Sequence, residues 1–395
     1  MTRRRLLVCV FALILIGERS WAQLSFLPIS SREGLTANTS VARSRSSLAP
    51  LSNPASSAAR GEDQMDSEIS ISSNLYMLTM VESRGGSDKG SFRSGYSSIP
   101  TSLGGRRTFG RMQTTFGLYQ SERYVFDYRY PLSLARMKAD LDVSHAAVAV
   151  GMKEDGFRWG FAMCATTYQL HVDSQSAAAS SSQSGSVYYS WEERTRTDIS
   201  LSLGAILDLD DGISIGLSIR SPSLELMSRV EGNRVMAAVS PSASAATISI
   251  EGLSNSNQLL GNGVEGIVGF SIDGSSHRLS SEIAFFENRG NSMTGVGGEV
   301  LVRLGDEYRY SDSTSLIAGL AFGVADAFGH DISARRKTVP VTATVGSEFR
   351  FAQDKVFTAG LFHSNFIDWE IEDDGRFPYS VPVRGGMILA GALEF

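Results

Sequence analysis

The sequence predicts an all-β fold, a transmembrane antiparallel β-barrel of about 14 strands with a short N-terminal plug. Apolar and polar residues alternate with a period of two from Asp66 to the last residue. Many alternating segments reach ten residues or more, close to the ~9–11 that cross a bilayer at a tilt and longer than the ~5–6 of soluble strands. Long and short connections largely alternate, as they do when the two ends of a barrel face different compartments.

The first 22 residues have the three regions of a secretory signal peptide. Arg3–Arg5 form a basic region, Leu6–Gly17 form an apolar core, and Ser20–Ala22 resemble a cleavage site. We therefore predict a signal peptide over residues 1–22 and a mature chain that begins at Gln23. An uncleaved anchor is the alternative, since the region before the cleavage site is more charged than usual.

The composition excludes several other classes of protein. The 395 residues are 42% hydrophobic and 20% charged, so the chain can bury a large structure. Outside the N-terminus, no apolar run approaches the ~18 residues that a membrane helix requires. Cleavage would change 36 basic minus 42 acidic residues into 32 minus 41, a net charge of -9 that argues against a nucleic-acid partner. Cys164 would then be the only cysteine, which excludes an intrachain disulfide.

Residues 23–66 show neither the helical nor the strand period in their hydrophobic pattern and are rich in Ser, Ala and Asn. Side chains nearly fill the interior of a barrel with ~8 strands, whereas a barrel with ~16–18 strands contains an aqueous channel. A barrel of about 14 strands therefore encloses more volume than its inward side chains fill. We therefore predict that residues 23–66 fold into the barrel as a plug. The alternative is a disordered periplasmic tail, which the Ser and Ala content also permits.

Residues 67–395 form the predicted barrel. In 341–351 the odd positions are apolar apart from Ser347 and the even positions are Thr, Gly, Glu and Arg, so one face would meet lipid and the other the lumen. The predicted strands cover 67–82, 97–109, 112–129, 141–153, 157–173, 187–209, 212–229, 261–272, 276–287, 294–304, 314–325, 336–352, 355–370 and 381–395. Among the long connections, 174–186 is Ser-rich and 230–260 is the longest.

The chain ends in Phe395, with Leu393 and Leu389 on the same face of the last predicted strand. A terminal Phe that closes an alternating strand resembles the C-terminal signal of bacterial outer-membrane barrels. Together with the signal peptide, it predicts insertion into the bacterial outer membrane by the barrel-assembly machinery, with outer-membrane lipid around a multi-pass wall.

Four short motifs stand at characteristic places along the chain. They are Asn53-Pro54-Ala55 in the plug, Ser98-Ile99-Pro100 in the second strand, Arg158-Trp159-Gly160-Phe161 in the fifth, and Arg220-Ser221-Pro222 in the seventh. With the signal peptide, they resemble the FadL/TodX-type family of outer-membrane long-chain fatty acid and hydrocarbon transporters. The family usually has an aromatic residue before Asn-Pro-Ala and a glycine after it, where this sequence has Ser52 and Ser56.

The resemblance implies a fourteen-stranded barrel whose plug blocks a straight channel. It also implies that hydrophobic ligands are captured at the outer loops and released sideways, through a gap beside a kinked strand. The predicted function is therefore passive outer-membrane uptake of long-chain fatty acids or other hydrophobic compounds in a Gram-negative bacterium. A general or solute-specific porin and a structural or adhesive outer-membrane barrel are the alternatives.

Charged residues at inward positions are the candidates for lining the lumen or binding ligand. They are Arg220, Arg278, Arg303, Glu299, Glu348 and Arg350, with Glu282 beside them. A lumenal Arg could bind a carboxylate head group in bidentate fashion. Alternatively, the charges pair with one another and hold the plug to the wall. Apolar residues at other inward positions leave a similar choice between amphipathic cargo and a packed plug; they are Ile206, Ile267, Phe286, Leu301 and Ile317.

No catalytic residue, cofactor or metal site is predicted. The five histidines have no recognisable nucleophile or acid at motif spacing. The predicted partners are therefore a hydrophobic small molecule, outer-membrane lipid and the barrel-assembly machinery.

Overall fold

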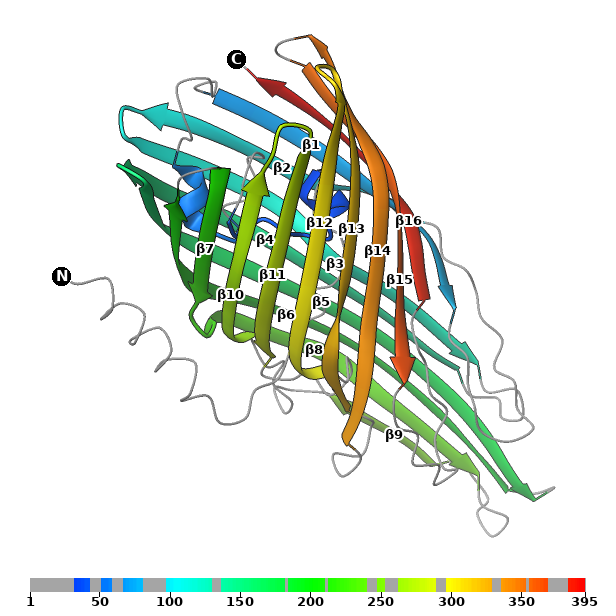
Figure 1. The fold of residues 1–395 in the computed structure, drawn as a ribbon. Helices are drawn as coiled ribbons and strands as arrows, with labels where there is room; N and C mark the ends of the chain where they lie inside the picture. Colours follow the sequence, from blue (N-terminus) through cyan, green and yellow to red (C-terminus); the bar gives the residue numbers. More distant parts are fainter. Residues whose placement is uncertain are drawn as a thin grey trace.

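The computed structural model is almost entirely strand, which confirms the predicted all-β class (Figure 1). It describes residues 32–42, 51–58, 67–80, 97–129, 136–181, 184–209, 212–239, 247–252, 262–288, 296–328, 335–352, 355–368 and 383–394. The predicted signal peptide, residues 1–22, and Phe395 lie outside the described residues. The division of the chain into plug and barrel near residue 66 stays a prediction. No described helix has both the length and the apolar character needed to cross a membrane.

The described elements are two short helices and sixteen strands. The helices are α2 (Arg32–Leu35) and the 3-10 helix η2 (Pro54–Ser57). The strands are β1 (Ser67–Met80), β2 (Ser97–Phe109), β3 (Met112–Arg129), β4 (Arg136–Glu154), β5 (Phe157–Ser181), β6 (Ser184–Asp208), β7 (Ile213–Arg220), β8 (Leu224–Val239), β9 (Thr247–Gly252), β10 (Asn262–Asp273), β11 (His277–Asn288), β12 (Val296–Ser311), β13 (Thr314–Phe328), β14 (Arg335–Ala352), β15 (Lys355–Asp368) and β16 (Val383–Glu394).

Fourteen of the described strands pair in a closed ring. Neighbours along the chain pair from β1 to β7, β7 pairs with β10, neighbours pair again from β10 to β16, and β16 pairs with β1. Every pair is antiparallel. The ring confirms the prediction of a barrel with about 14 strands. Closure pairs the backbone groups of each strand with both neighbours, which a sheet in lipid requires.

The predicted single strand 212–229 is wrong, because the structure divides it. β7 ends at Arg220, and β8 begins at Leu224. Pro222 lies between them and cannot donate a backbone hydrogen bond to a ladder. β7 pairs with β6 and β10, whereas β8 continues along β6 past the end of β7 and pairs with β9. The predicted connection 230–260 therefore contains part of β8 and all of β9.

The strands β5 and β6 are longer than predicted, with 25 residues each. They pair along nearly their whole length, so the predicted connection 174–186 is mostly strand. Only about 9–11 residues are needed to cross a bilayer. With β8 and β9 they form a sheet that projects beyond the ring (Figure 1).

The exposure of side chains confirms the predicted alternation. On β14, Val345 is 58% exposed and its neighbour Thr344 is 5% exposed. On β6, Leu203 is exposed and Ser202 is buried. A long band of exposed aliphatic and aromatic side chains therefore covers the outer face of the ring, as a lipid-facing wall requires, while the lumen carries the polar and small residues.

Candidate functional site in the lumen

Two described segments of the N-terminal region lie inside the ring of strands (Figure 1). We call residues 32–42 and 51–58 the inner segments. α2, in the first, contacts β13, β14, β15 and β16, whereas η2, in the second, contacts β3, β4, β5 and β6. These two groups of strands lie on nearly opposite sides of the ring, so the inner segments together reach both walls.

The Asn53-Pro54-Ala55 motif forms the start of η2. Asn53 is the N-cap, and its side-chain oxygen accepts a hydrogen bond of 3.0 Å from the backbone N–H of Ala55. Pro54 occupies the first helical position, where no N–H is needed. The amide nitrogen of Asn53 donates to the carbonyl oxygen of Val41 at 2.5 Å. All three residues of the motif are buried, and one asparagine ties the two inner segments together.

Three glycines on neighbouring strands make room for η2. Gly151 of β4 pairs with Gly160 of β5, which pairs with Gly204 of β6. A Cβ atom added to Gly160 would overlap the backbone of Pro54, and one added to Gly204 would overlap the side chain of Asn53. We call Gly151, Gly160 and Gly204 the glycine seat. Glycine within a strand permits such a close approach of another backbone.

Paired glycines repeat this arrangement under the first inner segment. Gly216 pairs with Gly269 beneath Val41, and Gly346 pairs with Gly360 beneath Leu35. The hydroxyl of Thr344, two residues before Gly346 on β14, donates a hydrogen bond of 2.5 Å to the carbonyl oxygen of Leu35. The inner segments are therefore packed against the wall without intervening side chains at these places.

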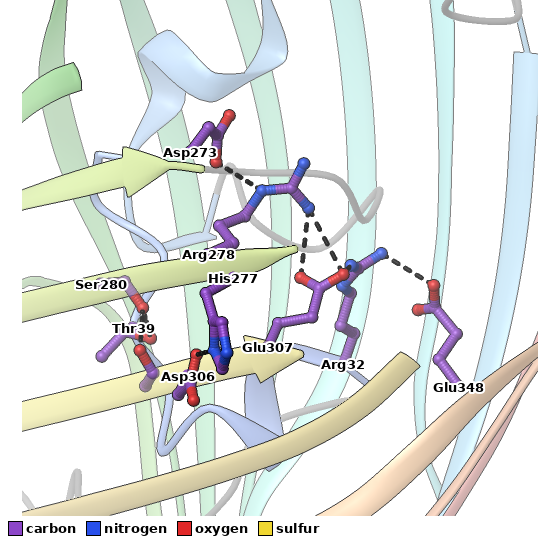
Figure 2. Close-up of polar contacts among 10 residues, drawn as sticks. Arg32, Thr39, Asp273, His277, Arg278, Ser280, Asp306, Glu307 and Glu348 are labelled. Carbon is purple, nitrogen blue, oxygen red and sulfur yellow. Dashed lines mark hydrogen bonds and ion pairs between the residues drawn. The ribbon is translucent and has the colours of Figure 1, made fainter. Parts of the chain in front are cut away.

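Arg32 of α2 lies between two carboxylates of the wall (Figure 2). Its guanidinium group donates to Glu348 at 2.9 Å and also to Glu307. Glu307 accepts a second hydrogen bond from Arg278 at 3.1 Å, and Arg278 also donates to Asp273. Residues from α2, β10, β11, β12 and β14 thus form one charged network, which we call the Arg32 network.

The electrostatics of the Arg32 network favour a fixed charge on α2. Burial alone would lower the pKa of Arg32, but the carboxylates of Glu348 and Glu307 outweigh it and raise the pKa above its ordinary value. Breaking a buried ion pair by removing one partner typically costs about 3–5 kcal/mol, because it leaves a charge without compensation. The network therefore anchors α2 to β12 and β14.

The other predicted site residues are also placed by the structure. Arg220 pairs with Glu265 at 2.7 Å and donates to the carbonyl oxygen of Leu51 in the second inner segment. Arg303 and Glu282 are buried together, with 3.5 Å between their charged groups. Glu282 in turn accepts a hydrogen bond from the backbone of Val41.

Glu299 and Arg350, the remaining two predicted residues, differ in their burial. Glu299 is buried on β12, as its inward position predicts. Arg350 is exposed near the end of β14. Contacts of Arg220, Arg278 and Glu348 with the inner segments or with wall carboxylates favour the alternative in which the charges hold the N-terminal region to the wall. A ligand contact by any of the six residues stays a prediction.

Four of the five inward apolar residues, Ile267, Phe286, Leu301 and Ile317, are packed in one cluster with the first inner segment, and the fifth, Ile206, is also buried. Leu35, Val41 and Ala42 belong to one buried cluster with seven wall side chains from six strands. The wall residues of this cluster are Ile267, Ala284, Phe286, Leu301, Ile317, Phe362 and Ile388. Arg303 lies over the ring of Phe286, 5.3 Å from its centroid. The lumen wall therefore carries an apolar cluster against the first inner segment, with a cation packed on one of its rings.

Sequence reasoning missed Arg32 and the glycine seat. Glycine at an inward position of a predicted strand is a detectable signal, because glycine is depleted in strands unless another group approaches closely. Arg32 gave no such signal, since its partners Glu307 and Glu348 are hundreds of residues away in the sequence.

Neither a protein-family model nor a curated protein matches the chain. Several solved structures are similar to the chain. The P. putida toluene transporter TodX is similar with a TM-score of 0.67 and 12% identity, covering 94% of this chain and 99% of that one. The Ralstonia pickettii toluene transporter TbuX has a TM-score of 0.65 and 12% identity over 94% and 99%. A Pseudomonas aeruginosa FadL homologue has a TM-score of 0.64 and 10% identity over 95% and 100%. These likenesses show that the chain has the fold of the FadL/TodX-type transmembrane β-barrels.

Proposed function

We propose that this barrel takes up hydrophobic compounds, such as long-chain fatty acids or hydrocarbons, passively across the outer membrane of a Gram-negative bacterium. In this proposal the N-terminal region acts as a plug, so cargo cannot follow a straight path. The proposal needs no catalytic residue, cofactor or metal. Outer-membrane lipid and the barrel-assembly machinery are the other partners we propose.

The observation that carries the proposal is the packing of the inner segments across the lumen. They contact β13–β16 on one side and β3–β6 on the other. The glycine seat and the Arg32 network hold them there. A general porin needs an open aqueous path through the barrel, whereas a transporter of apolar cargo works with an obstructed one.

A break in the wall supports a sideways route for the cargo. β2 and β3 pair only as far as Ser102 and Tyr119, although both strands continue beyond this pair. Both strands have a bulge next to this pair. Thr101 has no partner residue in the pairing of β2 with β1, and Ser121 has none in the pairing of β3 with β4. Such bulges bend a strand and end its pairing. We call this break the β2–β3 split.

The projecting sheet supports capture of apolar cargo outside the barrel. Val187 and Tyr189 of β6 lie on the same face as Ile248 and Ile250 of β9, because β8 pairs with both strands. All four side chains are exposed. Several exposed apolar residues on one face form the kind of patch that binds hydrophobic ligands.

Deletion of one bulge residue tests the proposal. Removing Ser121 should straighten β3 and extend its pairing, which would close the β2–β3 split. Uptake of a labelled long-chain fatty acid or of toluene by cells that express this variant should then fall to the level of cells without the protein. The matched control is deletion of Met77, which is skipped in the pairing of β1 with β16.

The control variant should keep its uptake, since its bulge lies elsewhere in the ring. Outer-membrane yield and heat-modifiable gel mobility establish that both variants are inserted and folded. Equal uptake by the two deletion variants would contradict release at the β2–β3 split. A large, steady ion current through the intact protein would favour a porin and overturn the proposed function.

A further inference from the structure

Three buried polar side chains of η2 and the neighbouring strand β3 each have an oxygen with no hydrogen-bond partner in the part of the chain that the structure describes. They are Ser57 of η2 and Gln113 and Thr115 of β3, which are 1%, 1% and 2% exposed. An unpaired polar group typically costs about 1–3 kcal/mol when buried. Three such groups at one place indicate that something else supplies their hydrogen bonds.

The backbone places these groups next to one another. Gln113 and Thr115 are two residues apart on β3, so their side chains point to the same side of the sheet, toward the lumen. Gln113 pairs with Gly151 of β4. A Cβ atom added to Gly151 would lie 3.0 Å from the Cβ atom of Ser57. The three side chains therefore lie near one another, on the β3 side of the glycine seat.

The chemistry of the three groups selects the missing partner. The side-chain nitrogen of Gln113 donates to the hydroxyl of Thr108 at 2.8 Å, which leaves its carbonyl oxygen in need of a donor. The hydroxyls of Ser57 and Thr115 can each donate or accept. A hydroxyl group matches this set, since it donates to the carbonyl and accepts from a neighbouring hydroxyl at once. A carboxylate has no proton for the carbonyl, and a hydrocarbon satisfies none of the three.

The same strand leads from the polar groups to an apolar cluster. Tyr119 is four residues beyond Thr115 on the same face of β3, roughly 13 Å away at the rise of a strand. It is buried together with Leu51, Ala147 and Cys164. Between the two ends, Gly117 pairs with Ala147, so small residues line the wall. A molecule with a polar end and an apolar chain fits this order.

We propose that Ser57, Gln113 and Thr115 bind the hydroxyl group of an aliphatic alcohol, whose chain extends along β3 toward Tyr119. Medium-chain alcohols are then among the cargo of the barrel. Water supplies the same hydroxyl chemistry when no cargo is bound. This inference rests on the proposed function, because it requires apolar cargo inside the lumen.

Equilibrium binding to the purified full-length protein in detergent tests the inference, with detergent micelles alone as the blank. The probes are radiolabelled 1-octanol, octane and octanoate. One hydrogen bond contributes a net ~1 kcal/mol, so octanol should bind about fivefold more tightly than octane. Thr115→Val and, separately, Ser57→Ala should each remove most of this preference by weakening octanol binding, and leave octane binding unchanged.

Thr342→Val is the matched control. Thr342 is also a buried inward threonine, but it lies on β14, and its hydroxyl is 2.7 Å from that of Ser364. This variant should keep the octanol preference. Equal binding of octanol and octane by the wild-type protein would overturn the inference, and so would an octanol preference that survives both Thr115→Val and Ser57→Ala. Water would then be the only occupant of the site, and the proposed function would still stand. Binding of none of the three probes would overturn the proposed function itself.

Discussion

The side-chain amide of Asn53 donates a hydrogen bond of 2.5 Å to the carbonyl oxygen of Val41, and thereby joins the two inner segments across the lumen. Val41 packs on the paired glycines of β7 and β10, while Asn53 lies on the glycine seat. A change at either residue is therefore transmitted to two different parts of the wall.

The first prediction concerns the glycine seat. Gly204→Ala places a methyl group where the side chain of Asn53 now lies. We expect η2 to be displaced, because backbone and a capping side chain cannot move aside without losing the contacts of the inner segments. Planar-bilayer recordings should therefore show a higher conductance than that of the wild-type protein.

Gly266→Ala is the control for this substitution. Gly266 lies on β10, and a Cβ atom added there would have no neighbour within 4 Å. Both variants add the same methyl group to a strand, so they have the same local effect on strand propensity. A conductance increase of equal size in both variants would show that the seat does not position η2.

The second prediction concerns the Arg32 network. Arg32→Met removes the cation between Glu348 and the buried Glu307, so the attachment of α2 to the wall should weaken by about 3–5 kcal/mol. The variant should show frequent channel openings and faster proteolysis of its N-terminal region. Arg229→Met is the control, because Arg229 and its partner Glu231 are 72% and 49% exposed and such pairs contribute about 0–1 kcal/mol. Indistinguishable recordings from the two variants would contradict an anchoring role for Arg32.

The third prediction concerns the lipid-facing surface. Val345→Arg should destabilise the barrel by about 2–4 kcal/mol if residue 345 lies near the bilayer midplane. Phe351→Arg should cost about 0–1 kcal/mol, since Phe351 lies on the same face of β14 but at its end, near the interface. Urea unfolding in liposomes measures both values. Equal costs at the two positions would place β14 outside the lipid band.

The local features of the fold could be predicted from the sequence. Strand bounds such as those of β2 and β3 follow from period-two alternation and from turn residues, both of which are local properties. The break between β7 and β8 was missed because alternation continues on both sides of it, although Pro222 marks the place. The extension of β5 and β6 was missed because a run of Ser and Ala reads as a flexible connection.

The candidate site could be predicted only in part. Inward positions of Arg278 and Glu348 follow from the same alternation, and the motif at Asn53 identified the residues that enter η2. The partner of these charges, Arg32, could not be chosen from the sequence, because α2 is far from β12 and β14 along the chain and only closure of the ring brings them together. The polar groups at Gln113 and Thr115 carry no motif at all.

Planar-bilayer conductance of a protein that lacks residues 24–59 tests the central claim most directly. The ring of strands satisfies its own backbone hydrogen bonds, so the truncated protein should still insert. Side chains nearly fill a barrel of ~8 strands, whereas a barrel of ~16 strands contains an aqueous channel. The truncated barrel lies between these sizes and should therefore conduct ions. We predict a steady ion current through the truncated protein and a low conductance for the intact one. Equal conductance of the two proteins would contradict the account, because the N-terminal region would then not obstruct the lumen.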